Sequence, residues 1–237
     1  MGATLTVLSA GAVRRGVTAI AEIFEREKGA RFDMDFSSAP KVRARVQSGE
    51  QSDIVIASST ALDALARESR IVAGSRVVLG RSRMVVVMRK GAIAPDLSSA
   101  AAFERAMLEA EQVLNNQGSS GIYVEKLVDQ LALRGRLGPK FRTVQNGAEM
   151  MEIIASHAGR VLGLAQISNL VDHAERGSAV ELAGFFPDEI QNATLYEAAV
   201  SANSRDAGTA GEFVRSFASA EARKLLAATG LDQSGVA

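Results

Sequence analysis

The strongest constraint on the fold is a unit that recurs along the first part of the chain: a short apolar run, a loop of small residues and an amphipathic stretch. Residues 4–9 are β-rich and lead through Ala10 and Gly11 into a helical pattern that Gly29 ends. Two similar units follow, with strands expected at residues 31–36 and 54–57 and helices at residues 40–47 and 61–69. Such pairs in succession predict a parallel sheet with right-handed crossovers.

A second series of strands and helices begins with a β-branched run at residues 83–88. Helices are expected at residues 100–110, 121–133, 148–157 and 168–175, and strands at residues 111–115, 141–145, 161–165 and 180–182. The chain then extends over residues 193–202 and ends in one long amphipathic helix at residues 210–228, closed by Gly230. This alternation indicates an α/β fold.

The composition excludes several classes of function. Hydrophobic residues make up 47% of the 237 residues and charged residues 23%, which is the balance of a globular protein. Because 27 basic residues meet 27 acidic ones, the charge gives no sign of binding to nucleic acid or to an acidic membrane. The lack of cysteine removes disulfides and thiolate chemistry. No run is long and apolar enough for membrane insertion, and the N-terminus does not read as a signal peptide, so a mature, trimmed or cytosolic chain is expected.

Enzyme and metal motifs give no positive signal. HExxH, GxSxG and P-loop patterns are missing from the sequence, and His157 and His173 each come late in a predicted helix. Asp33 and Asp35 share one face of a strand, where exposed charges at a sheet edge are the expected role. The basic residues between 76 and 90 are expected to form a solvated rim, since no aromatic residues for base stacking lie among them. The sequence predicts neither a metal nor a cofactor.

Small-residue loops before predicted helices are the best candidates for a binding site. A helix start offers unpaired N–H groups and a partial positive charge, and small residues let an anion approach that backbone. In open α/β sheets these loops lie at the carboxyl ends of the strands, where ligands bind. Taken singly, each loop is more often an ordinary cap or turn than a binding site. The loops are residues 9–12, 37–39, 116–121 and 146–147.

Several segments carry a resemblance to a known family. They are TLTVLSAGAV, FSSAPKVRARVQSGEQSDIVIASS, RSRMVVVMRKG, SSGIYVEKLVDQLAL, RVLGLAQIS and FVRSFASAEARKLLAATG. The run GEQSDIVIAS is similar to the GxxADxxIxA pattern of the molybdate-binding proteins of bacterial ABC transporters, which belong to the type II periplasmic solute-binding proteins. The chain resembles a divergent member of that family over nearly its whole length.

The resemblance implies a two-lobed α/β fold in which each lobe is a mainly parallel sheet flanked by helices. Lobe I would comprise residues 1–82 and 195–237 and lobe II residues 83–194, with a ligand cleft between them. The ligand-binding residues implied by the resemblance and by the loops are Ser9, Ala10, Gly11, Ala12, Arg14, Ser38, Ala39, Lys41, Ser58, Ser119, Ser120, Gly121, Tyr123, Asn146, Gly147 and Gln166.

The sequence departs from the family's pattern at the positions that would hold an oxyanion. Ala12 and Ala39 stand where hydroxyl-bearing serines are expected, Gln166 stands for a tyrosine and Gly147 for an aliphatic residue. Basic residues flank the first two helix starts instead, namely Arg14, Arg15 and Lys41. Loss of hydroxyl donors with a gain of cations favours an organic carboxylate over a molybdate-type oxyanion.

Two functions from different classes follow from the resemblance. The first is a solute-binding protein, expected to be a monomer, that captures a small anion for an ABC permease; it would be periplasmic if a signal peptide was trimmed and cytoplasmic otherwise. The second is an isomerase of an unsaturated tricarboxylate, of the aconitate isomerase kind, for which Tyr123, Lys41 and Glu125 are the candidate proton-transfer groups. A ligand-sensing domain of a regulator is a third reading, although no DNA-binding helix pair is evident.

Overall fold

The chain forms two compact units, and the computed structural model describes residues 4–175 and 177–235. Unit 1 is made of Met1–Ser82 and Thr194–Ala237, and unit 2 is Arg83–Ala193. The chain therefore passes between the units twice, within the strand β4 (Val77–Arg89) and at the start of β9 (Ala193–Val200). Within the described residues, no helix combines the length and apolar character that a membrane span requires.

The sheet of unit 1 contains the three parallel strands predicted from the sequence. They are β1 (Thr4–Ala10), β2 (Arg31–Ser37) and β3 (Ile54–Ser58). The strand order is β2-β1-β3-β9-β4, with β1 parallel to β2 and β3, and β9 antiparallel to β3. Because β2 is the edge strand, its exposed Asp33 and Asp35 lie where charges discourage pairing with another sheet.

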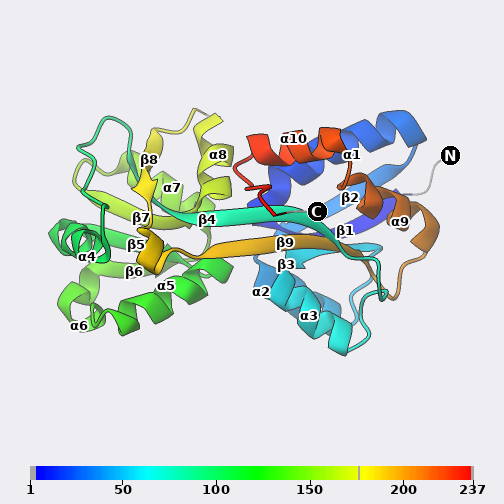
Figure 1. Cartoon of the computed structure of the whole chain (residues 1–237), viewed down its shortest axis with the longest axis horizontal. Helices are drawn as coiled ribbons and strands as arrows, with labels where there is room; N and C mark the ends of the chain where they lie inside the picture. The colour runs from blue at the N-terminus through cyan, green and yellow to red at the C-terminus, as the bar shows by residue number, and fades with distance from the viewer. Residues whose placement is uncertain (1–3, 176, 236–237) are drawn as a thin grey trace. The chain divides into compact units, whose positions relative to one another are not determined.

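Helices cover both faces of this sheet (Figure 1). They are α1 (Arg14–Lys28) after the short η1 (Gly11–Val13), α2 (Ala39–Gln47), α3 (Ser59–Arg67), α9 (Ala207–Ser216) and α10 (Ala220–Ala228). The prediction of one long C-terminal helix was wrong. Ser219 has an extended backbone and accepts a hydrogen bond from the Ala222 N–H, so it ends one helical run and caps the next.

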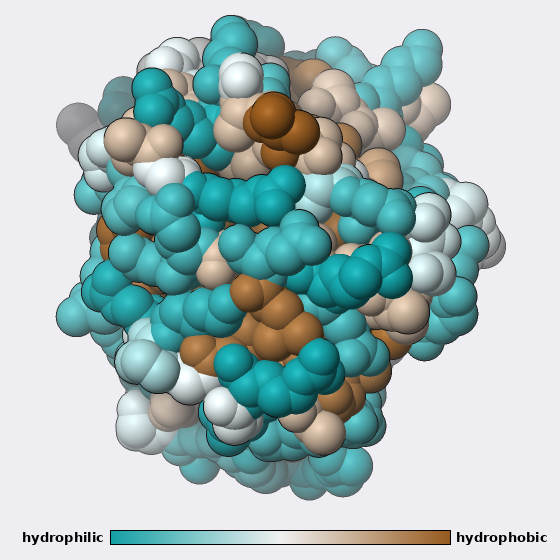
Figure 2. Space-filling model, turned by 90° about the vertical axis from the view of Figure 1, so that its left-hand side faces the viewer, coloured by the Kyte–Doolittle hydropathy of each residue, from teal (hydrophilic) through white to brown (hydrophobic). Residues whose placement is uncertain are grey.

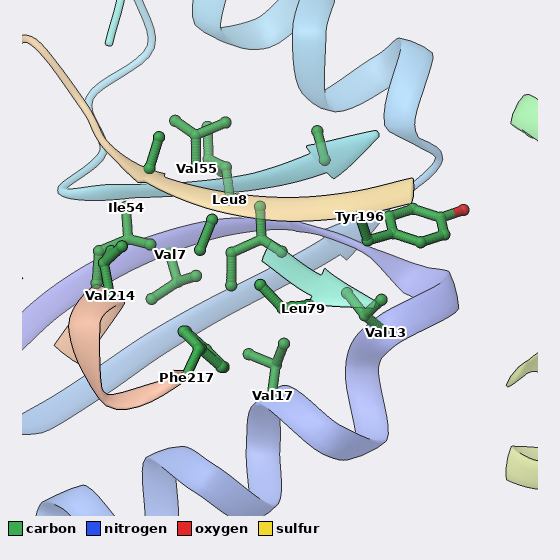
Figure 3. Close-up of a cluster of buried hydrophobic side chains, with 14 of the residues drawn as sticks. Val7, Leu8, Val13, Val17, Ile54, Val55, Leu79, Tyr196, Val214 and Phe217 are labelled. Atoms are coloured by element: carbon green, nitrogen blue, oxygen red, sulfur yellow. The ribbon is translucent and has the colours of Figure 1, made fainter. Parts of the chain in front are cut away.

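The core of unit 1 lies between the sheet and the helices on both of its faces. Figure 3 shows Val7, Leu79, Val17 and Phe217 pointing into a common cluster from strands and helices far apart in the sequence. These side chains are fully buried. Each buried aliphatic or aromatic side chain of this size contributes about 1.5–3 kcal/mol to folding, so the cluster fixes α1 and α9 against the strands.

Unit 2 repeats the architecture with a mixed sheet. The strand order is β4-β7-β5-β6, and β8 pairs with the other side of β4. Its further strands are β5 (Gln112–Asn116), β6 (Phe141–Val144), β7 (Val161–Gln166) and β8 (Val180–Phe185). β5 is parallel to β6 and β7, whereas β7 and β8 are antiparallel to β4.

The helices of unit 2 lie close to the predicted positions, apart from one short addition. They are α4 (Ala100–Glu109), α5 (Ser119–Gln130), α6 (Arg134–Leu137), α7 (Gly147–Ser156) and α8 (Ile167–Glu175), with short turns η2 (Gly138–Lys140) and η3 (Asp188–Ile190). The single-turn α6 was not predicted, because four residues cannot show a helical period. One apolar cluster contains Phe103 and Phe186, and a second contains Met150 and Met151.

The face of unit 2 shown in Figure 2 is mainly hydrophilic, with apolar colour confined to small areas. The large apolar side chains exposed among the described residues of this unit are Ile93, Ile122, Leu182 and Phe185. Small separate areas of this kind are normal on a protein surface.

Asp53 connects three distant parts of unit 1. Its carboxylate accepts hydrogen bonds from the Thr6 N–H at 2.8 Å, the Arg205 N–H at 2.8 Å and the Ser204 hydroxyl at 2.9 Å. Burial alone would raise the pKa of Asp53, but these donors outweigh it and hold the pKa below its ordinary value. The charged carboxylate therefore fastens β1 and the segment after β9 to the start of β3.

Replacing Asp53 tests this connection. We expect Asp53→Asn to lower the free energy of unfolding by about 1–3 kcal/mol, since buried donors lose their charged acceptor. Because the folded-state pKa is lowered, the contribution is complete above the unfolded-state pKa of about 3.9 and is lost as the pH falls through the folded-state pKa. The difference from wild type, measured by urea unfolding, should therefore shrink below about pH 4.

Asp33→Asn is the matched control, because Asp33 is exposed on the edge strand. An equal loss of stability in both variants, or a loss in Asp53→Asn that does not change with pH, would contradict the role given to Asp53.

Candidate functional site

The carboxyl ends of β1, β2 and β3 bring the predicted loops of unit 1 to one edge of its sheet. The register pairs Ala10 with Ser37 and Ser9 with Ile56, so the strands end at the same level. η1, α2 and α3 begin directly after these ends. The predicted residues at 9–14, 38–41 and 58 therefore lie around one group of helix starts, where an open α/β sheet binds its ligands.

The serines at two of these helix starts do not cap their own helices. Ser38 and Ser58 have the extended backbone of an N-cap, but neither side chain accepts a hydrogen bond from the first turn. Ser99 and Ser219, at the starts of α4 and α10, do accept such a bond from the residue three positions on. The first-turn N–H groups of α2 and α3 thus lack the side-chain acceptor that the other two helices have.

Positive side chains occupy the first turns of α1 and α2. Arg14 and Arg15 begin α1 and Lys41 lies in the first turn of α2, and neither turn contains an acidic residue. A cation at a helix N-terminus opposes the helix dipole and costs about 0.3–1 kcal/mol. α7 and α10 have Glu149 and Glu221 in their first turns, as the dipole prefers. The basic residues in the first turns of α1 and α2 therefore add to the positive ends of the helix dipoles and make the electrostatic potential at this sheet edge positive.

Asp35 partly balances this potential. Its carboxylate binds the Arg45 guanidinium at 2.7 Å, and Arg45 also pairs with Glu50. The hydrogen bond from Arg45 lowers the pKa of Asp35, with additional effects from the charges of Lys41 and Arg14. Because Asp35 forms its ion pair with Arg45, the charges of Lys41 and Arg14 are not neutralised by a direct ion pair with Asp35.

Other residues at this edge have packing roles or buried hydroxyl groups. Ala39 is 4% exposed and belongs to the core, and Ala12 packs against it. The Ser9 hydroxyl donates to the Ala10 carbonyl at 3.2 Å. The Ser37 hydroxyl is buried and has no hydrogen-bond partner within the described part of the chain. Ser37 lies in the predicted loop 37–39 but was not named among the ligand-binding residues.

In unit 2, the loop between β5 and α5 is organised by its own side chains. Asn116 Oδ1 accepts from the Gly118 N–H at 2.7 Å, and Asn116 Nδ2 donates to the Ser120 hydroxyl at 3.4 Å. A Cβ atom on Gly121 would lie 1.5 Å from the Asn116 carbonyl oxygen. Gly121 is therefore required for α5 to begin so close to β5, and the start of α5 has no side-chain cap.

The start of α7 is already satisfied by local groups. Asn146 Oδ1 accepts from the Glu149 N–H at 3.0 Å, and the Glu149 carboxylate accepts from the Gln145 N–H at 2.8 Å. Gly147 lies against Asn169, since an added Cβ would be 3.3 Å from its side-chain nitrogen. A negative side chain at this helix start makes it a weaker anion site than the starts of α2 and α3. Gln166 is buried at the end of β7.

The remaining titratable candidates are engaged in unit 2. Tyr123 donates to the Ile190 carbonyl at 2.7 Å, and burial raises the pKa of its hydroxyl. Glu125 accepts from Thr143, Asn115 and Arg134, and these hydrogen bonds hold its pKa below the usual value although burial opposes them. His157 accepts from the Gly159 N–H at 3.0 Å. The described residues contain no group of three side chains suited to holding a metal ion.

Residues 5–232 match the bacterial extracellular solute-binding proteins, and the chain belongs to that family. It is 28% identical over 236 residues to an aconitate isomerase of a Pseudomonas species, covering 96% of this chain and 87% of the relative. Its fold is similar to the periplasmic molybdate-binding protein of Azotobacter vinelandii, with a TM-score of 0.78 at 16% identity, over 96% of this chain and 98% of that one. The sulfate-binding protein SubI of Mycobacterium tuberculosis gives a TM-score of 0.76 at 16% identity, over 97% and 86% of the two chains.

These comparisons confirm the predicted type II periplasmic-binding fold and the predicted resemblance to molybdate-binding proteins. They also establish the broad class of function, because the family is one of solute-binding proteins. The TM-scores show that the fold is shared with these solved structures. Because the sequences are only 16% identical, the likeness says nothing about the ligand of this chain.

The close contact at Gly121 gives a prediction for unit 2. We expect Gly121→Ala to destabilise the start of α5 and lower the melting temperature by several degrees, because the new methyl group meets a backbone carbonyl that cannot move freely. Circular dichroism on heating measures the change. Gly135→Ala is the control, since Gly135 has open space around its Cβ position. Equal melting temperatures for the two variants would show that the loop yields easily.

Proposed function

We propose that this protein is a solute-binding protein that captures a small organic carboxylate and delivers it to the permease of an ABC transporter in the periplasm. The observation that carries the proposal is the edge of unit 1 where two serines leave their helix starts uncapped beside the cations Arg14 and Lys41. The backbone N–H groups at these helix starts can donate hydrogen bonds to the two oxygen atoms of a carboxylate. A neighbouring side-chain cation can add a charge-assisted hydrogen bond to the same group.

The choice of a carboxylate follows from the donors that are present. Alanine at positions 12 and 39 gives methyl groups where a compact tetrahedral oxyanion would need hydroxyl donors. Arg14 and Lys41 carry their charges at the ends of long side chains, which can reach carboxylate groups that lie apart on one ligand. A carboxylate bound by one helix start and one cation satisfies this donor set better than molybdate does.

Lys41 provides the direct test. Within the described residues it has no hydrogen-bonded or ion-paired partner, and its charge acts on Asp35. We expect Lys41→Ala to weaken carboxylate binding by about 10- to 100-fold, because a charge-assisted hydrogen bond is lost. Titration calorimetry with succinate, citrate, trans-aconitate, molybdate, tungstate and sulfate measures the affinities of wild type and variant.

Lys90→Ala is the matched control, since Lys90 is also exposed but lies in unit 2 at the end of β4. Equal effects of the two substitutions would make Lys41 an ordinary surface charge. Strong binding of tungstate with no binding of any carboxylate would overturn the choice of ligand.

A second candidate function is isomerisation of an unsaturated tricarboxylate, favoured by the 28% identity to an aconitate isomerase over 96% of the chain. Such a reaction moves a proton between carbon atoms and needs a base beside the bound acid. Tyr123 and Glu125 are held in hydrogen bonds, and the lowered pKa of Glu125 makes it a weak base. Lys41 is the cation of the binding proposal, so in this reaction it would hold a carboxylate of the substrate rather than act as the base.

Incubation with trans-aconitate distinguishes the two functions. The isomerase candidate predicts formation of cis-aconitate, followed by proton nuclear magnetic resonance, and loss of at least 10-fold in rate for Lys41→Ala but not for Lys90→Ala. Binding of trans-aconitate without turnover at high protein concentration would leave the transport function and remove the isomerase.

A further inference from the structure

Arg14 is held against an aromatic ring at the proposed site. Its guanidinium carbon lies 4.3 Å from the centroid of the Phe36 ring. Arg14 has no ion pair within the described residues, and Asp35, which lies within reach of its charge, is bound to Arg45. The principal contact that orients Arg14 is therefore the face of Phe36.

This stack offsets an unfavourable position. Arg14 is the first residue of α1, where the helix dipole repels a cation. An arginine over an aromatic face gains about 0.5–1 kcal/mol at an exposed site, and the stacked guanidinium keeps its N–H edges free for hydrogen bonds. A side chain that would otherwise sample many rotamers is thus held in one region.

Phe36 also stands in register with the ligand-binding edge. It pairs with Ser9 in the β1–β2 ladder and precedes Ser38, the N-cap of α2, by two residues. Alternate residues of an extended chain point to the same side and lie about 7 Å apart. The stack of Arg14 on Phe36 therefore lies at the carboxyl end of β2, on the face of that strand that α1 covers.

We propose that Phe36 is a positioning residue that holds Arg14 to bind a second carboxylate of the ligand, so that the protein selects molecules with two or more carboxylates. This inference rests on the proposed function and narrows its ligand class. The uncapped starts of α2 and α3, together with Lys41, bind one carboxylate, and Arg14 binds another through its guanidinium.

The test is a double-mutant cycle on Arg14 and Phe36 with succinate and trans-aconitate as polycarboxylates and butyrate as the monocarboxylate. We expect Arg14→Gln to weaken polycarboxylate binding by about 10-fold or more, and Phe36→Leu by about 2- to 10-fold. The double variant should bind as weakly as Arg14→Gln alone, because Phe36 acts through Arg14. Phe36→Tyr keeps the ring and should bind within about 2-fold of wild type.

Phe141→Leu is the matched control, since it removes another phenylalanine that lies under an arginine, at 5.8 Å from Arg134 in unit 2. We expect it to leave the affinity unchanged. Thermal unfolding of every variant checks that each one is folded at the temperature of the titration.

The outcomes separate the inference from the proposed function. Wild-type protein that binds neither polycarboxylate overturns both. Wild-type binding with an unchanged affinity in Phe36→Leu, additive effects in the double variant, or equal affinity for succinate and butyrate overturns the inference alone. A weakened Phe36→Leu that Phe36→Tyr does not restore would also contradict it, because the ring is the feature that the stack requires.

Discussion

The arrangement of unit 1 depends on one buried carboxylate. Asp53 lies where β3 begins and holds backbone and hydroxyl donors from β1 and from the segment after β9. Hydrophobic burial alone would hold these segments together without specifying their position along one another. A charged acceptor with several short hydrogen bonds does fix it, and so aligns the strand ends. The alignment of β1 with β3 sets the common level at which η1 and α3 begin, and the β1–β2 ladder brings the start of α2 to the same edge.

The proposed site combines two departures from the usual rules for helix starts. α4, α7, α9 and α10 begin with side-chain caps. α2 and α3 begin with serines that do not cap, and α1 and α2 carry cations in their first turns. Each departure costs stability where it occurs, and departures of this kind concentrate at functional sites in natural proteins. Both departures occur at one sheet edge, and this combination supports the proposed binding surface, whereas a missing cap alone does not, because α5 also lacks one.

Much of the fold could be predicted because strand and helix periods are local properties. The three strand–helix pairs of unit 1 and most helices of unit 2 were predicted within a few residues. The break at Ser219 was missed because the apolar period continues across it, and only the backbone shows that the serine caps a second helix. For the proposed site, the small-residue loops and the basic residues beside them could be identified from the sequence. Three features depend on side-chain geometry that no spacing encodes: the stack of Arg14 on Phe36, the absence of a cap bond from Ser38 and Ser58, and the capped start of α7.

The order in which the chain enters its two units has a consequence for folding. Unit 2 is one continuous stretch, whereas unit 1 needs β9 and the segment after it, which come more than 100 residues later than β3. During synthesis, β3 therefore waits as an unpaired edge and Asp53 lacks two of its donors until the last fifth of the chain has emerged. Unit 2 can complete its own sheet in the meantime. The polypeptide thus completes the proposed binding edge only when its own synthesis is almost finished, so the proposed anion site would form late in folding.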